Sequence, residues 1–116
     1  MRPADFRYSE RADADISEIL LETERRFGPR QQSSYAGLID KAAGMVGENP
    51  DRAGSQSRPD LGAGIRSFPI RLAAGRRGAA AHTLYYRIDP AEQRVLILRL
   101  LHDRMEPARH LTEDLT

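Results

Sequence analysis

An almost unbroken apolar run, residues 95–101, is the feature that most constrains how this chain can fold. A strand that is apolar on both faces is normally covered on both faces, so we expect residues 94–102 to form an inner strand of a sheet. Side-chain alternation predicts one face with Val95, Ile97, Arg99 and Leu101 and another with Leu96, Leu98, Leu100 and His102. A buried arginine is costly unless it reaches solvent or a partner. We therefore expect Arg99 to mark the place where one face of the sheet becomes accessible.

The length of 116 residues fits a single domain, predicted to span residues 1–116. The sequence has no cysteine, which excludes disulfides and thiolate chemistry and suits a reducing cytosol. No segment resembles a signal peptide, and no apolar run approaches the ~20 residues that span a membrane. We therefore expect a cytoplasmic protein that does not bind membranes.

The basic residues are almost all arginines, because Lys41 is the only lysine among 18 of them. Genome base composition alone can produce such a bias. The distribution along the chain is more informative, since acids outnumber bases by nine to seven in residues 1–49 and bases lead by eleven to eight after that. The second half of the chain therefore offers cations to a negatively charged partner.

The first half of the sequence predicts a short strand and two helices. Residues 5–10 alternate like an edge strand, and Asp13 or Asp15 is expected to cap the helix that follows. The apolar stripe of that helix consists of Ile16, Ile19, Leu20, Thr23 and Phe27. Gly28 and Pro29 separate it from a second helix, which stops at residues 47–50 and carries Tyr35, Leu38, Ile39, Ala42, Met45 and Val46 on one face. So short a connection predicts an antiparallel helical hairpin.

The second half predicts three strands after a loop at residues 50–64. In residues 65–72, alternation directs Phe68, Ile70 and Leu72 inward and Ser67 and Arg71 outward, and Pro69 indicates an edge strand or a bulge. A flexible basic turn at 73–81 precedes a strand at 82–88, whose inner face carries Leu84, Tyr86 and Ile88. Residues 107–111 begin a short terminal helical turn. The predicted fold class is α+β in the order β-α-α-β-β-β, with the helical hairpin packed on an antiparallel sheet.

Familiar catalytic and cofactor motifs are absent from the sequence. The Gly-Ala-Gly at residues 62–64 matches neither a dinucleotide loop nor a phosphate loop, and no serine has the context of a nucleophile elbow. The histidines, His82, His102 and His110, lack metal-ligand spacing. We therefore expect neither a metal nor a cofactor.

The charged end of the last strand is the remaining candidate for chemistry. Histidine is the natural acid or base near neutral pH, and arginine binds phosphate or carboxylate well. The candidates are His102, Asp103 and Arg104, with Arg66, Arg71, Arg87 and Arg99 on neighbouring strands. The alternative is a solvated sheet face on which His102 and Asp103 only hydrogen-bond to hold the last turn. Residue spacing alone favours this structural alternative.

Five segments resemble the ParE branch of the RelE/ParE toxins of bacterial type II toxin–antitoxin systems. They are residues 9–16 (SERADADI), 27–28 (FG), 65–69 (IRSFP), 84–88 (LYYRI) and 97–111 (ILRLLHDRMEPARHL). The resemblance extends over nearly the whole chain in the family's order, and LYYR and RLLHDRM are its most specific parts. The resemblance departs from the family at residues 73–81, where many relatives turn more tightly.

The resemblance implies a small toxin neutralised by a cognate antitoxin that is encoded beside it. ParE members act on DNA gyrase, which implies non-enzymatic inhibition through Arg99, His102, Asp103 and Arg104. The implied antitoxin has a DNA-binding N-terminal domain and an acidic C-terminal segment, so this chain itself need not bind specific DNA sequences. That acidic segment is expected to meet Arg66, Arg71, Tyr85 and Arg87.

Two alternatives to gyrase inhibition stay open. RelE members cut mRNA in the ribosome with basic residues plus a tyrosine or histidine near the end of the last strand, and here Arg99, His102 and Arg104 would take those roles. That set is incomplete, because no lysine pair precedes the strand and no tyrosine follows Tyr86. A degenerate toxin that only binds its antitoxin is the third possibility.

Overall fold

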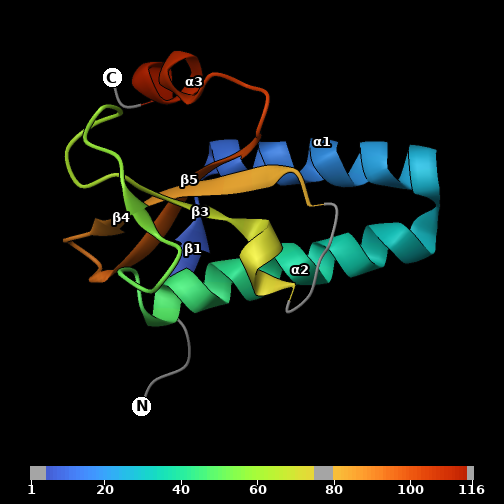
Figure 1. Ribbon diagram of the computed structural model, residues 1–116, viewed down its shortest axis with the longest axis horizontal. Coiled ribbons are helices and arrows are strands. Elements are labelled where there is room, and N and C mark those ends of the chain that lie inside the picture. The colour runs from blue at the N-terminus through green and yellow to red at the C-terminus, as the bar shows by residue number, and fades with distance from the viewer. Residues whose placement is uncertain (1–4, 75–79, 115–116) are drawn as a thin grey trace.

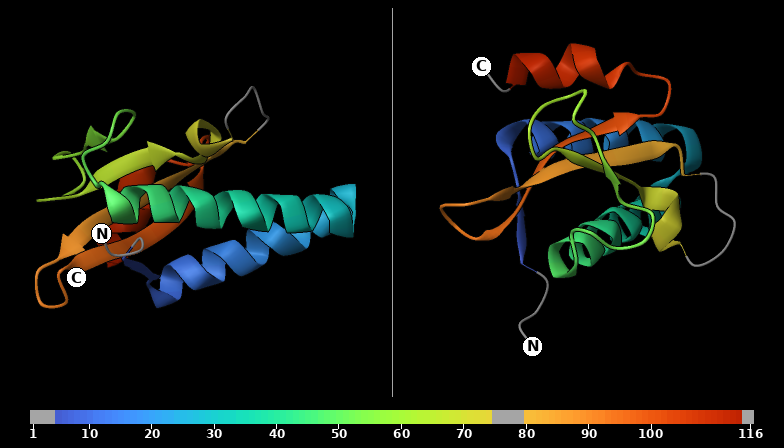
Figure 2. Two further views of the ribbon diagram at one scale, coloured as in Figure 1. Left: turned by 90° about the horizontal axis from the view of Figure 1, so that it is seen from below. Right: turned by 60° about the vertical axis from the view of Figure 1, so that its left-hand side comes forward.

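Five strands form one mixed sheet, with a helical hairpin on one face and a short helix on the other (Figures 1 and 2). The computed structural model describes residues 5–74 and 80–114. The strands, β1 (Phe6–Tyr8), β2 (Gln56–Ser57), β3 (Arg66–Pro69), β4 (His82–Asp89) and β5 (Arg94–His102), lie in the order β1-β5-β4-β3-β2. The helices are α1 (Glu10–Phe27), α2 (Pro29–Glu48) and α3 (Pro107–Asp114), with a short 3-10 helix, η1 (Ile70–Ala73). The predicted α+β fold class, with its helical hairpin and terminal helix, is confirmed.

Strand β5 lies between β1 and β4, which confirms that residues 94–102 form an inner strand. Strand β4 pairs with it in the antiparallel direction, as expected. Strand β1 is an edge strand, as predicted, but it pairs with β5 in parallel, so the sheet is mixed rather than wholly antiparallel. Ser9 extends this pairing, because its N–H donates to the Ile97 carbonyl at 2.9 Å and its hydroxyl donates to the Leu98 carbonyl at 2.8 Å.

A β-bulge in β5 changes which of its side chains share a face. Tyr86 lies opposite Ile97 whereas Tyr85 lies opposite Arg99, so Leu98 is the extra residue. Alternation is therefore broken there, and the predicted placement of Leu100 and Leu101 is wrong. Val95, Ile97 and Leu100 face the helical hairpin. The other face packs against α3 through Leu111 and consists of Leu61, Ile65, Tyr85, Leu96, Leu98 and Leu101.

The helical hairpin begins one turn earlier than predicted. Ser9 is the N-cap of α1, and its hydroxyl oxygen accepts from the Ala12 N–H at 3.0 Å. The prediction that Asp13 or Asp15 caps the helix is wrong, because a serine already stands in the extended conformation at the end of β1. Gly28 ends α1 with a φ of +91°, and Pro29 opens α2, both as expected.

The two helices pack side by side and project beyond the sheet (Figure 1). On α2, the buried residues that meet the sheet are Ile39, Ala42, Ala43 and Val46. On α1, Ile16, Ile19 and Leu20 pack against the same core. Phe27 was expected to extend this stripe, but it is 68% exposed because it lies at the tip of the hairpin. None of the helices in the described ranges combines the length and the apolar character needed to cross a bilayer.

The segment between α2 and β4 is more structured than expected. The loop at 50–64 contains β2, which pairs with β3, and the predicted strand at 65–72 divides into β3 and η1. Because η1 ends the alternation, Leu72 is 41% exposed although it was expected inward. Ser67 was expected outward, but it is buried in β3 opposite the buried Tyr85. In β4, Leu84 and Tyr86 are buried as predicted, but Ile88 is exposed. The basic turn expected at 73–81 falls partly on residues 75–79, which lie outside the described residues.

Candidate functional site

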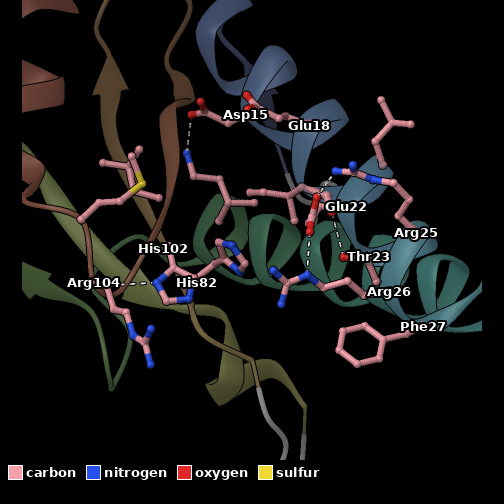
Figure 3. Close-up of a pocket in the computed structure, with 15 residues that line it drawn as sticks. Asp15, Glu18, Glu22, Thr23, Arg25, Arg26, Phe27, His82, His102 and Arg104 are labelled. Atoms are coloured by element: carbon pink, nitrogen blue, oxygen red, sulfur yellow. Dashed lines mark hydrogen bonds and ion pairs between the residues drawn. The ribbon is translucent and has the colours of Figure 1, made fainter.

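A groove of about 1040 Å³ runs between α1 and the neighbouring ends of β4 and β5 (Figure 3). Its lining from α1 consists of Asp15, Glu18, Ile19, Leu21, Glu22, Thr23, Arg25, Arg26 and Phe27. Its lining from the strands and the turn after β5 consists of His82, Leu100, Leu101, His102, Arg104 and Met105. Leu21, Phe27 and Met105 are large apolar side chains that solvent reaches. The groove therefore offers apolar surface between charged edges.

Most charges on the α1 side of the groove are already paired. Glu22 accepts a hydrogen bond from Arg26 Nε at 2.6 Å and also forms an ion pair with Arg25. These contacts, chiefly the hydrogen bond from Arg26, lower the pKa of the Glu22 carboxyl. Exposed pairs of this kind on one helix contribute little stability. Their main effect here is to neutralise one another at the edge of the groove.

Arg99 lies beneath the groove in a buried ion pair. Its Nε donates to Asp15 Oδ2 at 2.8 Å and its Nη2 donates to Asp15 Oδ1 at 2.9 Å. The same carboxylate accepts from the Leu100 N–H at 3.0 Å, and Arg99 Nη1 donates to the His110 carbonyl of α3 at 3.4 Å. Only 8% of Arg99 is exposed. The expectation that Arg99 reaches an accessible face is wrong, because Asp15 provides the partner that its burial requires.

His82 and His102 lie side by side at one end of the groove (Figure 3). They are directly opposite each other on β4 and β5, with ring centroids 5.2 Å apart. The Tyr35 hydroxyl lies 2.6 Å from His82 Nδ1. Burial, assisted by the neighbouring His102, lowers the pKa of His82 to about 4, and burial raises the pKa of Tyr35 to about 12. His82 is therefore a neutral imidazole at physiological pH.

The turn after β5 is held by the hydrogen bonds that the structural alternative requires. His102 Nδ1 accepts from the Arg104 backbone N–H at 3.0 Å, and Asp103 accepts from the Thr83 hydroxyl at 2.8 Å. The Asp103 N–H donates to the Ala81 carbonyl at 2.8 Å. The turn leaves the side chains of Asp103 and Arg104 exposed. The structure thus brings His102, Asp103 and Arg104 to one corner of the molecule.

The four residues expected to meet the antitoxin do not share one surface. Arg66 lies opposite Tyr86, on the hairpin side of the sheet, and donates to the Ser55 hydroxyl at 2.8 Å. Tyr85 is buried on the other face, under the Arg58 guanidinium. Arg87 is half-buried on β4, and Arg71 is exposed on η1. These positions separate the four residues into at least two faces.

His82 is the site residue that sequence analysis missed. Its signal was weak, because its pairing with His102 depends on the bulge at Leu98. Within the described ranges, no three His, Asp or Glu side chains gather as metal ligands would. The corner therefore offers imidazole and guanidinium groups for hydrogen bonding to a partner.

Comparisons with known proteins agree with this fold. The family model described as the ParE toxin of the type II toxin–antitoxin system parDE matches residues 6–107. Toxin ParE1 of Caulobacter vibrioides is 34% identical over 111 residues, which cover 96% of this chain and 99% of that protein.

Two solved structures resemble the fold. The chromosomal ParDE system from P. aeruginosa contains a chain that aligns with a TM-score of 0.65 at 15% identity, covering 84% of this chain and 94% of that one. The RelBE2 toxin–antitoxin complex from Mycobacterium tuberculosis contains a chain that aligns with a TM-score of 0.53 at 29% identity, covering 87% and 99%. The family match spans most of the sequence. This chain therefore belongs to the ParE toxin family of type II toxin–antitoxin systems.

Proposed function

We propose that this ParE-family toxin acts in the cytoplasm by binding and inhibiting DNA gyrase, and that a cognate antitoxin neutralises it. The burial of Arg99 is the observation that most supports a binding role over a nuclease role. A nuclease needs cations free to stabilise charge on the phosphate in the transition state. Of the three residues that would serve an mRNA endonuclease, Arg99 is committed to Asp15 beneath the surface. Inhibition of gyrase by binding alone does not require a set of free cations around a phosphate.

The target-binding surface that we propose is the corner formed by His102, Asp103 and Arg104. Asp103 and Arg104 are exposed there, and His102 is half-buried beside them. Arg99, expected to contact the target directly, is instead assigned a supporting role, because it ties β5 to α1 and to α3 below this corner. No proton transfer is required of His102 in this role.

The antitoxin is proposed to neutralise the toxin by filling the groove and covering this corner. An extended or helical partner with apolar side chains would suit the apolar floor of the groove. Relatives of similar fold are described as parts of ParDE and RelBE2 toxin–antitoxin systems, which supports a protein partner. Arg71 and Arg87, outside the groove, stay predicted as further contacts for an acidic segment.

The test compares wild type with His102→Gln and Arg104→Ala, expressed without antitoxin. Wild type should block supercoiling by purified gyrase and should leave ribosome-bound mRNA intact. His102→Gln should largely keep the inhibition, because glutamine preserves a hydrogen bond. Arg104→Ala should weaken it, whereas Arg30→Ala, an exposed arginine at the hairpin tip, should not.

The same experiment can identify the runner-up function. The adjacency of His102 and Arg104 is the one feature that favours an mRNA endonuclease. In that case wild type would cleave mRNA on the ribosome, and His102→Gln would lose roughly 10²–10⁴-fold of the rate. Cleavage that disappears in His102→Gln, with supercoiling untouched, would overturn gyrase inhibition. A chain that does neither would be a degenerate toxin.

A further inference from the structure

The charges that line the groove are distributed unevenly along it. Three acids, Asp15, Glu18 and Glu22, face three lining arginines, Arg25, Arg26 and Arg104, and Arg99 beneath the groove already neutralises Asp15. Glu22 is shared by Arg25 and Arg26. The three lining acids and the three lining arginines therefore balance in number, and the positive charge at the histidine end of the groove comes from Arg104. Arg104, at the histidine end of the groove, has an exposed side chain.

The two histidines add hydrogen-bond donors to this end of the groove. His102 Nδ1 accepts the Arg104 N–H, so the hydrogen of the neutral ring is on Nε2. The Tyr35 hydroxyl lies 2.6 Å from His82 Nδ1, and in the tautomer in which the hydroxyl donates, the ring hydrogen of His82 is also on Nε2. In that tautomer both rings present an Nε2–H group as a hydrogen-bond donor. A metal ion would need an unprotonated ring nitrogen as its ligand, whereas an anion would need an N–H donor.

We propose that His82, His102 and Arg104 form a carboxylate-binding subsite, and that its occupant is an acidic residue on an apolar segment of the antitoxin. Naming the antitoxin as partner rests on the proposed function, whereas the chemistry of the subsite does not. Ile19, Leu100 and Met105 line the same groove and would receive the apolar side chains of that segment.

A carboxylate suits this subsite better than a phosphate does. Glu18 on α1 lines the same groove, and exposed Asp103 directly follows His102 in the chain. Both carboxylates repel an incoming anion, and a phosphate with nearly two negative charges is repelled more than a carboxylate with one. The apolar floor also gives no advantage to a nucleic-acid backbone, whose recognition is mainly electrostatic.

The experiment measures peptide binding to the full-length protein by calorimetry. One synthetic probe is an amphipathic helical peptide with a leucine stripe that ends in Glu, and the matched probe ends in Gln. A charge-assisted hydrogen bond should make the Glu peptide bind roughly tenfold more tightly. Arg104→Gln, which removes the charge, and His102→Leu, which removes the ring donor, should each reduce this preference to within about threefold, and Arg30→Gln should retain it. Circular dichroism should show that all variants are folded.

Three results would overturn the assignment. The first is equal affinity for the two peptides, or no binding of either. The second is a preference for Glu that survives in both Arg104→Gln and His102→Leu. The third is displacement of the Glu peptide by inorganic phosphate at lower concentration than by acetate, which would indicate a phosphate site. Gyrase is absent from all of these measurements, so a failure to inhibit supercoiling would leave their outcome unchanged.

Discussion

Replacing Asp15 with alanine should be the most damaging single change to a polar residue in α1. The Asp15 carboxylate accepts two hydrogen bonds from Arg99 and one from the Leu100 N–H, all between 2.8 and 3.0 Å. Without it, the Arg99 guanidinium would stay buried after losing both of its hydrogen bonds to the carboxylate. Breaking a buried pair from one side typically costs about 3–5 kcal/mol. Asp15→Ala should therefore lower the free energy of unfolding by that amount, which is much of the stability of a small domain.

Urea unfolding followed by circular dichroism measures this loss, with Glu24→Ala as the matched control. Glu24 is an exposed carboxylate on the same helix, so its replacement should change stability by about 0.5 kcal/mol or less. The double variant Asp15→Leu/Arg99→Met should recover much of the loss, because apolar side chains of similar volume can replace a buried ion pair. Equal stability of Asp15→Ala and Glu24→Ala would refute the buried-pair reasoning. So would a double variant less stable than either single change.

Three further changes test other parts of the fold. Leu98→Ala should cost about 2–5 kcal/mol in thermal or urea unfolding, because Leu98 is buried on the face of the sheet that packs against α3. Arg87→Ala removes a guanidinium whose buried Nε has no partner among the described residues, so it should cost about 1 kcal/mol or less. Equal losses in the two variants would contradict this assignment. Ser9→Ala should cost about 1–2 kcal/mol, since it removes the cap of α1 and the bond to the Leu98 carbonyl. The pKa of His82 is lowered from 6.5 to about 4 in the folded protein, so the unfolded chain is protonated at His82 first as the pH falls. The free energy of unfolding should therefore decline between pH 6.5 and 4, by on the order of 1–2 kcal/mol after discounting for solvent screening. His82→Gln should flatten that part of the stability curve, and an unchanged slope would show that His82 is not responsible.

The elements with strong local signals were predictable from the sequence. The apolar stripes of the two helices, the Gly28-Pro29 break and the apolar run of β5 depend on short spacings, which hold wherever the segment lies. These local signals were sufficient to predict the helical hairpin, the inner strand and the α+β fold class. Face assignments in β4 also held for Leu84 and Tyr86, because the extra residue of the bulge lies in β5 and leaves the alternation of β4 unbroken.

The features that decide the site depend on contacts between distant residues. The local sequence around Asp15 suggested a helix cap, but its carboxylate binds Arg99 of β5, which lies 84 residues away. Local spacing could not predict that contact. The bulge at Leu98 has no local signal either. Near the turn between β4 and β5, Ile88 lies opposite Val95. If the same register continued along the strands without a bulge, His82 would lie opposite Leu101 instead of His102. One inserted residue therefore creates the histidine pair and moves Leu100 to the hairpin side.

The parallel pairing of β1 with β5 affects when the protein can fold during its synthesis. Residues 6–8 leave the ribosome early, but their partners are residues 95–97, so β1 cannot pair until those residues have been made. Bringing together segments so far apart must be completed before their contacts contribute stability, which slows folding. The ion pair between α1 and β5 imposes the same order. A growing chain therefore cannot complete the surface around His102 until β5 has been made.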